Sequence, residues 1–136
     1  MASGIYDCFK MDLPGKQVNL ATGGDTVKVT LYDNNHAFAA TAVTYTTANE
    51  LATAGGYARG DKSLSGGDIS CTSNTVTWDA TDISWTSASF TAYHAVIWDS
   101  TNTNSLICSI DFGGAETVYS GTFTIQWNSA GIITLA

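Results

Sequence analysis

Hydrophobic and polar residues alternate in several short stretches of the second half of the chain. In "TFTIQW", Phe123, Ile125 and Trp127 alternate with two threonines and a glutamine, the pattern of a half-buried β-strand. "TVTW" and "DISW" repeat the pattern on either side of residues 79–81, as two strands or as one strand broken by a bulge. Gly, Asn and Asp lie between these stretches. Their spacing predicts an all-β fold, an antiparallel β-sandwich or a flattened barrel.

The stretch "SFTAYHAVIWD" is the predicted central strand, because apolar residues occupy both of its faces. One face would hold Phe90, Ala92, His94, Val96 and Trp98, and the other Tyr93, Ala95 and Ile97. After a polar turn over residues 99–105, "LICSIDF" returns as the hairpin partner. Gly113 and Gly114 are expected to separate this pair from a further strand in "ETVYSGTFTIQW".

The first half predicts fewer strands. "TVKVTLYD" alternates Val27, Val29 and Leu31 with polar residues and reads as a half-buried strand. Residues 34–56 are small and polar, and we expect a long excursion over the surface. "YARGDKSL" is predicted to return as a strand.

The opening segment differs from the rest. Ile5, Phe9 and Leu13 recur at helical spacing, with Cys8 on the same side, so we expect a short helix from about residue 4 to 12, capped by Ser3. Its apolar stripe either packs on its own domain or reaches a partner. The predicted organisation is one domain, 1–136, with a helix or arm in 1–24 and the β core in 25–136.

The chain ends in a turn at residues 128–131 and an apolar stretch containing Ile132, Ile133 and Leu135. Edge strands are usually guarded by Lys, Pro or inward charges, and the final strands have none. We therefore expect them to be central in a sheet or covered by another subunit. The second alternative predicts a homo-oligomer, a trimer or a dimer.

Charge narrows the classes of partner. Charged residues make up only 12% of the chain and the net charge is −7, so the weakly charged surface is cheap to desolvate against a neighbour. All five basic residues lie in the first 62 positions: Lys10, Lys16, Lys28, Arg59 and Lys62. No basic footprint exists for nucleic acid, and an anionic membrane would repel the second half. We expect neither partner.

Cysteine usage and segment hydropathy bear on the compartment. Cys8, Cys71 and Cys108 are odd in number and widely spaced, which favours free, buried thiols over a zinc site. No signal peptide and no membrane span is recognisable. We expect folding in a reducing cytoplasm.

Candidate reactive groups are few. His36 lies in a predicted loop, and His94 on the central strand is expected to be a satisfied core residue. The carboxylate pairs Asp79 with Asp82 and Asp7 with Asp12 are better explained by turns and helix ends than by acid–base chemistry. No nucleophile, phosphate or metal motif is present, so we expect no enzyme activity, no metal and no cofactor.

Two further patterns have a functional and a structural interpretation. "RGD" at residues 59–61 is an adhesion tripeptide, but it also fits a turn entering a strand. Four tryptophans could stack on sugars, but their inward positions in the alternating pattern favour core packing; these are Trp78, Trp85, Trp98 and Trp127.

Motifs spread over most of the chain resemble one group of proteins. "YDCFK", "GDTVKVTLYD", "ANELATAGGYARGDKSL", "ISWTSASFTAYHAVIWD" and "SIDFGGAETVYSGTFTIQWNSAGIITLA", in this order, are similar to the pattern of small virion structural proteins of tailed bacteriophages. The resemblance implies a head decoration, or cement, protein that binds the major capsid protein on the head exterior after synthesis in the host cytoplasm. Attachment to the neck, tail or a fibre, or binding of a host surface glycan, remain alternatives.

This role gives the sequence its candidate contact residues. The basic residues lie in the first 62 positions, which makes that part the better candidate for the capsid side, whereas the acidic second half would face solvent. The expected capsid or partner contacts are Ile5, Phe9 and Leu13, as an arm, together with Lys10, Lys16 and Lys28.

Overall fold

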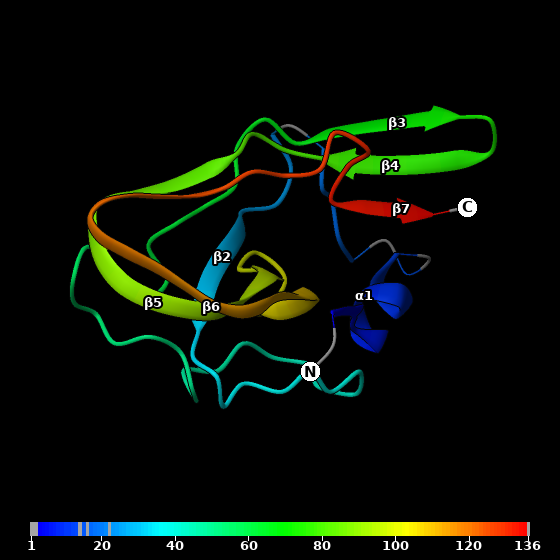
Figure 1. Ribbon diagram of the computed structural model, residues 1–136. Coiled ribbons are helices and arrows are strands. Elements are labelled where there is room, and N and C mark those ends of the chain that lie inside the picture. Colours follow the sequence, from blue (N-terminus) through cyan, green and yellow to red (C-terminus); the bar gives the residue numbers. More distant parts are fainter. Residues whose placement is uncertain (1–2, 14, 16, 22, 136) are drawn as a thin grey trace.

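The computed structural model describes residues 3–13, 15, 17–21 and 23–135. It is an all-β fold of two antiparallel sheets with one short N-terminal helix (Figure 1), which confirms the predicted fold class. The elements are β1 (Gly4–Ile5), α1 (Asp7–Asp12), β2 (Val27–Tyr32), β3 (Asp68–Thr72), β4 (Thr75–Asp79), β5 (Ile83–Asp99), β6 (Ser105–Ile125) and β7 (Ile133–Leu135).

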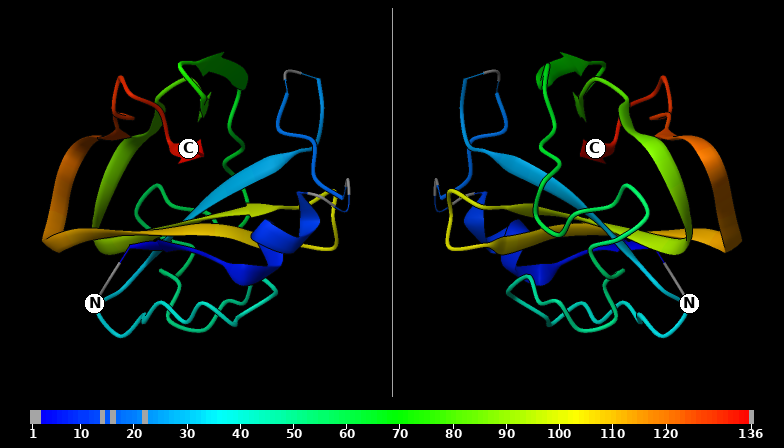
Figure 2. Two further views of the ribbon diagram at one scale, coloured as in Figure 1. Left: turned by 90° about the vertical axis from the view of Figure 1, so that its right-hand side faces the viewer. Right: turned by 90° about the vertical axis from the view of Figure 1, so that its left-hand side faces the viewer.

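The two sheets differ in size and position. The main sheet has the strand order β1-β6-β5-β2, and the small sheet has the order β3-β4-β7. In Figures 1 and 2 the long loop after β2 covers one face of the main sheet, and the small sheet lies on the side of the other face. The "TVTW" and "DISW" stretches are therefore two separate strands, β4 in the small sheet and β5 in the main one.

β5 and β6 form one long hairpin that bends over on itself (Figure 1). Bulges accommodate the bend: residues 112–115 of β6 lie opposite Tyr93 alone, and Tyr119 with Ser120 lie opposite Ser89. The predicted hairpin partner of the central strand is confirmed. The expected separation into two strands at Gly113 is wrong. β6 continues through this position as a bulge, with Gly113 at a φ of 82°.

β5 is an interior strand with apolar residues on both faces, as predicted. The larger core cluster contains Ala95 and Ile97, and the smaller cluster beneath the loop contains Val96 and Trp98. The alternation predicts Ala92 on the same face as Val96, but Ala92 lies in the larger cluster. The bulge at Tyr93 shifts the alternation by one residue, which explains this difference.

The N-terminal helix is shorter than predicted. Gly4–Ile5 form β1, paired with Cys108 and Ser109 of β6, and the helix begins only at Asp7. Ser3 does not cap it, because its hydroxyl accepts a hydrogen bond from the Asp111 N–H instead. Residues 4 and 5 thus pair with the unpaired backbone groups at the edge of β6 and do not form the first turn of the helix.

The loop of residues 33–67 contains no strand among the elements of the fold, which confirms the predicted excursion over 34–56. The returning strand expected in residues 57–64 is wrong. That segment forms two isolated bridges, between Ser63 and Lys28 and between Tyr57 and Ala54, because a turn at Gly60, with a φ of 70°, interrupts it.

The C-terminal turn is confirmed by the hydrogen bond from the Gly131 N–H to the Asn128 carbonyl. β7 then pairs with β4 only. It is therefore an edge strand, and the expectation that the last strand is central is wrong. Coverage of this edge by another subunit stays a prediction.

Candidate functional site

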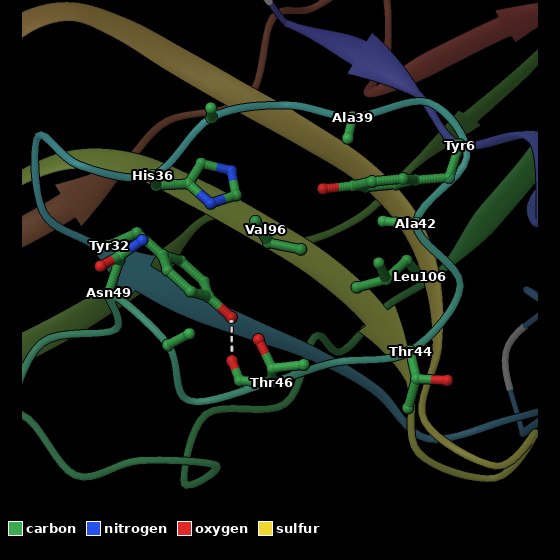
Figure 3. A pocket seen from close by; sticks show the side chains of 12 residues that line it. Tyr6, Tyr32, His36, Ala39, Ala42, Thr44, Thr46, Asn49, Val96 and Leu106 are labelled. Atoms are coloured by element: carbon green, nitrogen blue, oxygen red, sulfur yellow. Dashed lines mark hydrogen bonds between the residues drawn. The ribbon is translucent and has the colours of Figure 1, made fainter.

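A hollow lies beside the smaller core cluster, between the loop and the main sheet. It has a volume of about 210 Å³. Figure 3 shows Tyr6 and His36 on facing sides of it, with Val96 and Leu106 between them. Alanines and threonines of the loop supply most of the remaining lining. The hollow is smaller than the roughly 300–1,000 Å³ of typical small-molecule sites.

Two histidines meet beside this hollow. The rings of His36 and His94 are 5.1 Å apart, and His36 Nε2 lies 3.1 Å from the Ser109 hydroxyl. Burial lowers the pKa of both histidines, so the rings are neutral at pH 7. Ser109 is buried as well, while His36 lines this hollow and His94 lines a second one on the side of Asn34 and Asp111.

His94 is a core residue, as predicted, but its hydrogen bonds are not satisfied. Neither ring nitrogen has a hydrogen-bond partner among the described residues. The nearest carboxylate oxygen, Asp111 Oδ1, is 3.9 Å from Nδ1, beyond hydrogen-bond distance. A buried neutral imidazole without partners is a cost to stability.

A buried glutamate fastens the loop to the sheet. Glu50 accepts hydrogen bonds from the hydroxyls of Tyr45 and Tyr57, both at 2.5 Å. The Tyr57 hydroxyl also accepts from the Leu31 N–H, and Tyr45 stacks on Trp98 at 4.0 Å. Burial and the bonds to Glu50 raise the pKa of both tyrosines. The network acts as a structural clamp.

The carboxylates that come closest were not identified from the sequence. Asp99 is buried at the end of β5, and its Oδ1 accepts from the backbone N–H groups of Thr101 and Asn102. Its Oδ2 has no donor, because the group beside it is a second carboxyl, that of Asp25. Burial and this neighbour raise the pKa of Asp99 to about 7. When one of the two carboxyl groups is protonated, it can donate a hydrogen bond to the other.

The carboxylate pairs selected from the sequence were expected to serve turns and helix ends, but among the described residues only Asp79 accepts from a neighbouring backbone N–H. Asp79 and Asp82 accept from the backbone N–H groups of Ala80 and Trp127. In the helix, Asp7 pairs with Lys10, while Asp12 accepts from the side chains of Asn102 and Ser105. Neither pair meets at one site.

The tryptophans do not form a platform for sugars. Trp78, Trp85 and Trp98 are buried in the core, as the alternation predicted. Trp127 is partly buried and packs against the larger cluster. In the "RGD" segment, Arg59 donates to the backbone carbonyls of Glu50 and Leu51, so its guanidinium helps to hold the loop.

The contact residues predicted from the resemblance do not share one surface. Phe9 is buried in the protein's own core, and Ile5 and Leu13 are partly buried against it, so the apolar stripe packs on its own domain. An arm that exposes Phe9 to a partner is not the arrangement observed.

The lysines of that set are also dispersed. Lys10 lies 3.2 Å from Asp7 on the exposed side of α1. Lys28 lies on β2, at the opposite edge of the main sheet from β1, and donates to the Gly60 carbonyl. Lys16 falls outside the described residues.

The most exposed apolar surface was not predicted and belongs to the small sheet. Pairing aligns one apolar face across it, because residues directly opposite each other point to the same side: Ile69 with Trp78 and Ile133, and Cys71 with Val76 and Leu135. Trp78 and Ile133 are buried at the base. Towards the hairpin tip Ile69 is 50% exposed, Leu135 41% exposed, and Cys71 is exposed too, contrary to the expectation of buried thiols.

This face forms one wall of an apolar cleft. The other wall comes from Phe9 of α1 and from Leu13, which follows the helix. Met11 of the same helix is 75% exposed but does not line the cleft. Figure 1 shows the small sheet projecting beyond the main one, with α1 beside β7. Every charged residue of the small sheet sits at its base, where Asp68 pairs with Asp79. The described side chains of the projecting end are uncharged.

No protein-family model, no curated protein and no solved structure matches the chain. No helix among the described residues is long and apolar enough to cross a membrane. Those residues also contain no group of three or more His, Cys, Asp or Glu side chains placed to hold a metal ion.

Proposed function

We propose that this protein is a non-enzymatic virion structural protein of a tailed bacteriophage, most consistent with a decoration protein that binds the head shell. The sequence resemblance suggests the class. The observation that carries the proposal is the projecting small sheet, whose apolar face is left half uncovered at Ile69, Cys71 and Leu135. Exposed apolar clusters of this kind are typical of protein interaction surfaces.

The surface we assign to the shell is the mouth of the cleft between α1 and β7. Leu135 lines the cleft and is 41% exposed. The cleft is shared between the N-terminal segment, through Phe9, Leu13 and Leu20, and strands of the acidic second half. The proposed surface therefore differs from the expectation that only the first 62 residues face the shell.

Binding at this mouth would be modest for each copy. Complete burial of one leucine side chain contributes roughly 1.5–3 kcal/mol, or roughly a tenfold to hundredfold change in affinity. A shell lattice repeats each contact many times, so contacts of this strength suffice for high occupancy.

The test is co-sedimentation with expanded, undecorated shells of the phage that encodes the chain. Wild-type protein should pellet with the shells to a saturating occupancy. Leu135→Asp should weaken binding about tenfold or more, since it places a charge in the cleft mouth at a partly exposed position. Tyr119→Asp is the matched control, because Tyr119 is 87% exposed on β6, and it should bind normally. Absence of saturable wild-type binding would overturn the proposal.

Copy number separates the head from the neck, tail or a fibre. Quantitative mass spectrometry of purified virions should find hundreds of copies per particle for a decoration protein. A handful of copies would indicate a tail or neck part instead.

A further inference from the structure

The protein seals the edges of its main sheet with its own chain. On β2, the carbonyl of Val27 and the N–H of Val29 bond with Leu64 and Lys62, and the carbonyl of Leu31 accepts from the Leu51 N–H. On β6, β1 covers Cys108 and Ser109. Beyond them the two bulges of β6 interrupt the regular spacing of its edge, which is a common protection against pairing.

The outer edge of β3 has no such protection. Its five residues pair with β4 without any register shift, and all five are exposed. β3 contains no lysine, arginine or proline. Among the described residues, no other strand pairs with its outer side. The adjoining turn at Ser73 and Asn74, both with positive φ, gives the tight hairpin that keeps the strand regular. Such an edge is a template for another extended strand.

The sequence of β3, "DISCT", is complementary to itself when read antiparallel. With Ser70 at the centre, Ser70 lies opposite its own copy, Ile69 opposite Cys71, and Asp68 opposite Thr72. Apolar residues therefore meet apolar residues, and polar residues meet polar ones. The two Asp68 carboxylates would lie at opposite ends, about 14 Å apart along the strands, which is beyond the screening length of about 8–10 Å at moderate salt.

We propose that β3 pairs antiparallel with β3 of a second copy about a twofold axis near Ser70, which joins two small sheets into one sheet of six strands. Ile69 and Cys71 lie on the face of Trp78 and Val76, so the joined sheet has one continuous apolar face. A twofold contact of this kind is closed and yields a dimer, not a fibre.

This pairing is independent of the proposed attachment to a phage shell, because it uses the edge of β3 and not the cleft mouth beside α1. Five residues form a small interface, below the roughly 1,200 Å² of standard complexes. The dimer is therefore weak and dependent on protein concentration.

Sedimentation equilibrium of the isolated protein, from about 1 μM to 1 mM, tests the pairing. We expect a monomer at the low end and a dimer to accumulate towards the high end. Ser70→Lys should weaken dimerisation about tenfold or more, because it sets two lysines against each other at the axis. Thr134→Lys is the matched control. Thr134 is exposed and shares a row of the sheet with Ser70 through Thr77, but it lies on β7 at the opposite edge.

Disulfide trapping tests the axis itself. In a Cys71→Ser background, Ser70→Cys should form an intermolecular disulfide under mild oxidation, and Thr134→Cys should not, because only residue 70 meets its own copy. A monomer at 1 mM would overturn the proposal. So would a dimer that Thr134→Lys abolishes and Ser70→Lys leaves intact. If β3 became protected from hydrogen exchange only on added shells, an extended segment of a shell protein would be the occupant, and self-pairing would be wrong.

Discussion

The two sheets of this protein are built from similar residues but differ in how their apolar faces are used. The main sheet is covered on both sides, by loop residues such as Phe38 and Tyr45 on one face and by the larger core cluster, which includes Tyr57 of the same loop, on the other. The small sheet is anchored through Trp78 and Ile133 at its base and leaves the rest of its apolar face and the edge of β3 uncovered. From this contrast we propose that the main sheet supplies most of the stability and that the small sheet makes the contacts with other molecules.

The contrast can be tested with one substitution made at two places. Ile97 on β5 is completely buried, and Ile69 on β3 is half exposed. Ile97→Ala should lower the free energy of unfolding by about 2–5 kcal/mol, since it leaves a cavity in the core. Ile69→Ala should lower it by less than about 1 kcal/mol. Urea unfolding followed by tryptophan fluorescence measures both, and equal losses would contradict the assignment.

The clamp at Glu50 should matter almost as much as core packing. Tyr57→Phe removes a donor to the buried Glu50 carboxylate and an acceptor for the Leu31 N–H. Unfolding should become about 1–3 kcal/mol easier. Tyr119→Phe changes an exposed tyrosine and serves as the control. A Tyr57→Phe variant as stable as the control would show that the loop is held by other contacts.

The carboxyl pair predicts a pH dependence in the main sheet. The pKa of Asp99 is raised from its ordinary value of 3.8 to about 7, so the folded state binds the shared proton more tightly than the unfolded state. The resulting stabilisation is complete below about pH 3.8 and is lost as the pH rises to about 7, at up to about 1.4 kcal/mol per pH unit.

The two histidines have an opposite effect. Their pKa values are lowered by folding, so they destabilise the protein as the pH falls below about 6.5. The comparison must therefore be made with Asp99→Asn, which keeps the acceptor for the Thr101 and Asn102 N–H groups. The stability of wild type relative to this variant should decline between pH 4 and 7. A constant difference would exclude a shared proton.

The smallest perturbation is chemical labelling of the native thiols. Cys71 on β3 is exposed, whereas Cys108 on β6 is buried and burial raises its pKa to about 12. An alkylating reagent that reacts with thiolates should, at pH 8, modify Cys71 rapidly and Cys108 only after unfolding. Mass spectrometry of digested protein resolves the two sites. Comparable rates would mean that the main sheet opens as readily as the small one.

Much of the fold could be predicted from the sequence, because alternation reports local burial. The class, the central strand β5, its hairpin and the final turn follow directly from periodicity and turn residues. The errors occur where tertiary context decides the outcome. Gly4 and Ile5, predicted to be helical, pair with the edge of β6 as a strand. Ala92 lies on the other face than predicted, because a bulge at Tyr93 shifts the alternation.

The candidate site was harder to predict than the fold. Ile69, Cys71 and Leu135 look like ordinary inward positions in an alternating pattern, and their exposure follows only from the projection of the small sheet beyond the core. The Asp25–Asp99 pair joins residues far apart in the chain, so spacing gave no signal. The hairpin turn at Ser73 and Asn74 was the one local indication that β3 and β4 form a separate ribbon.

Hydrogen exchange at protein concentrations that keep the chain monomeric tests the division of roles most directly. Amides of β2, β5 and the Ser105–Ile110 part of β6 should exchange only through global unfolding, while amides of β3 that bond to β4 should exchange at least about tenfold faster through local opening. Exchange of β3 at the same rate as β5 would mean that both sheets belong to one cooperative unit, and it would contradict the account.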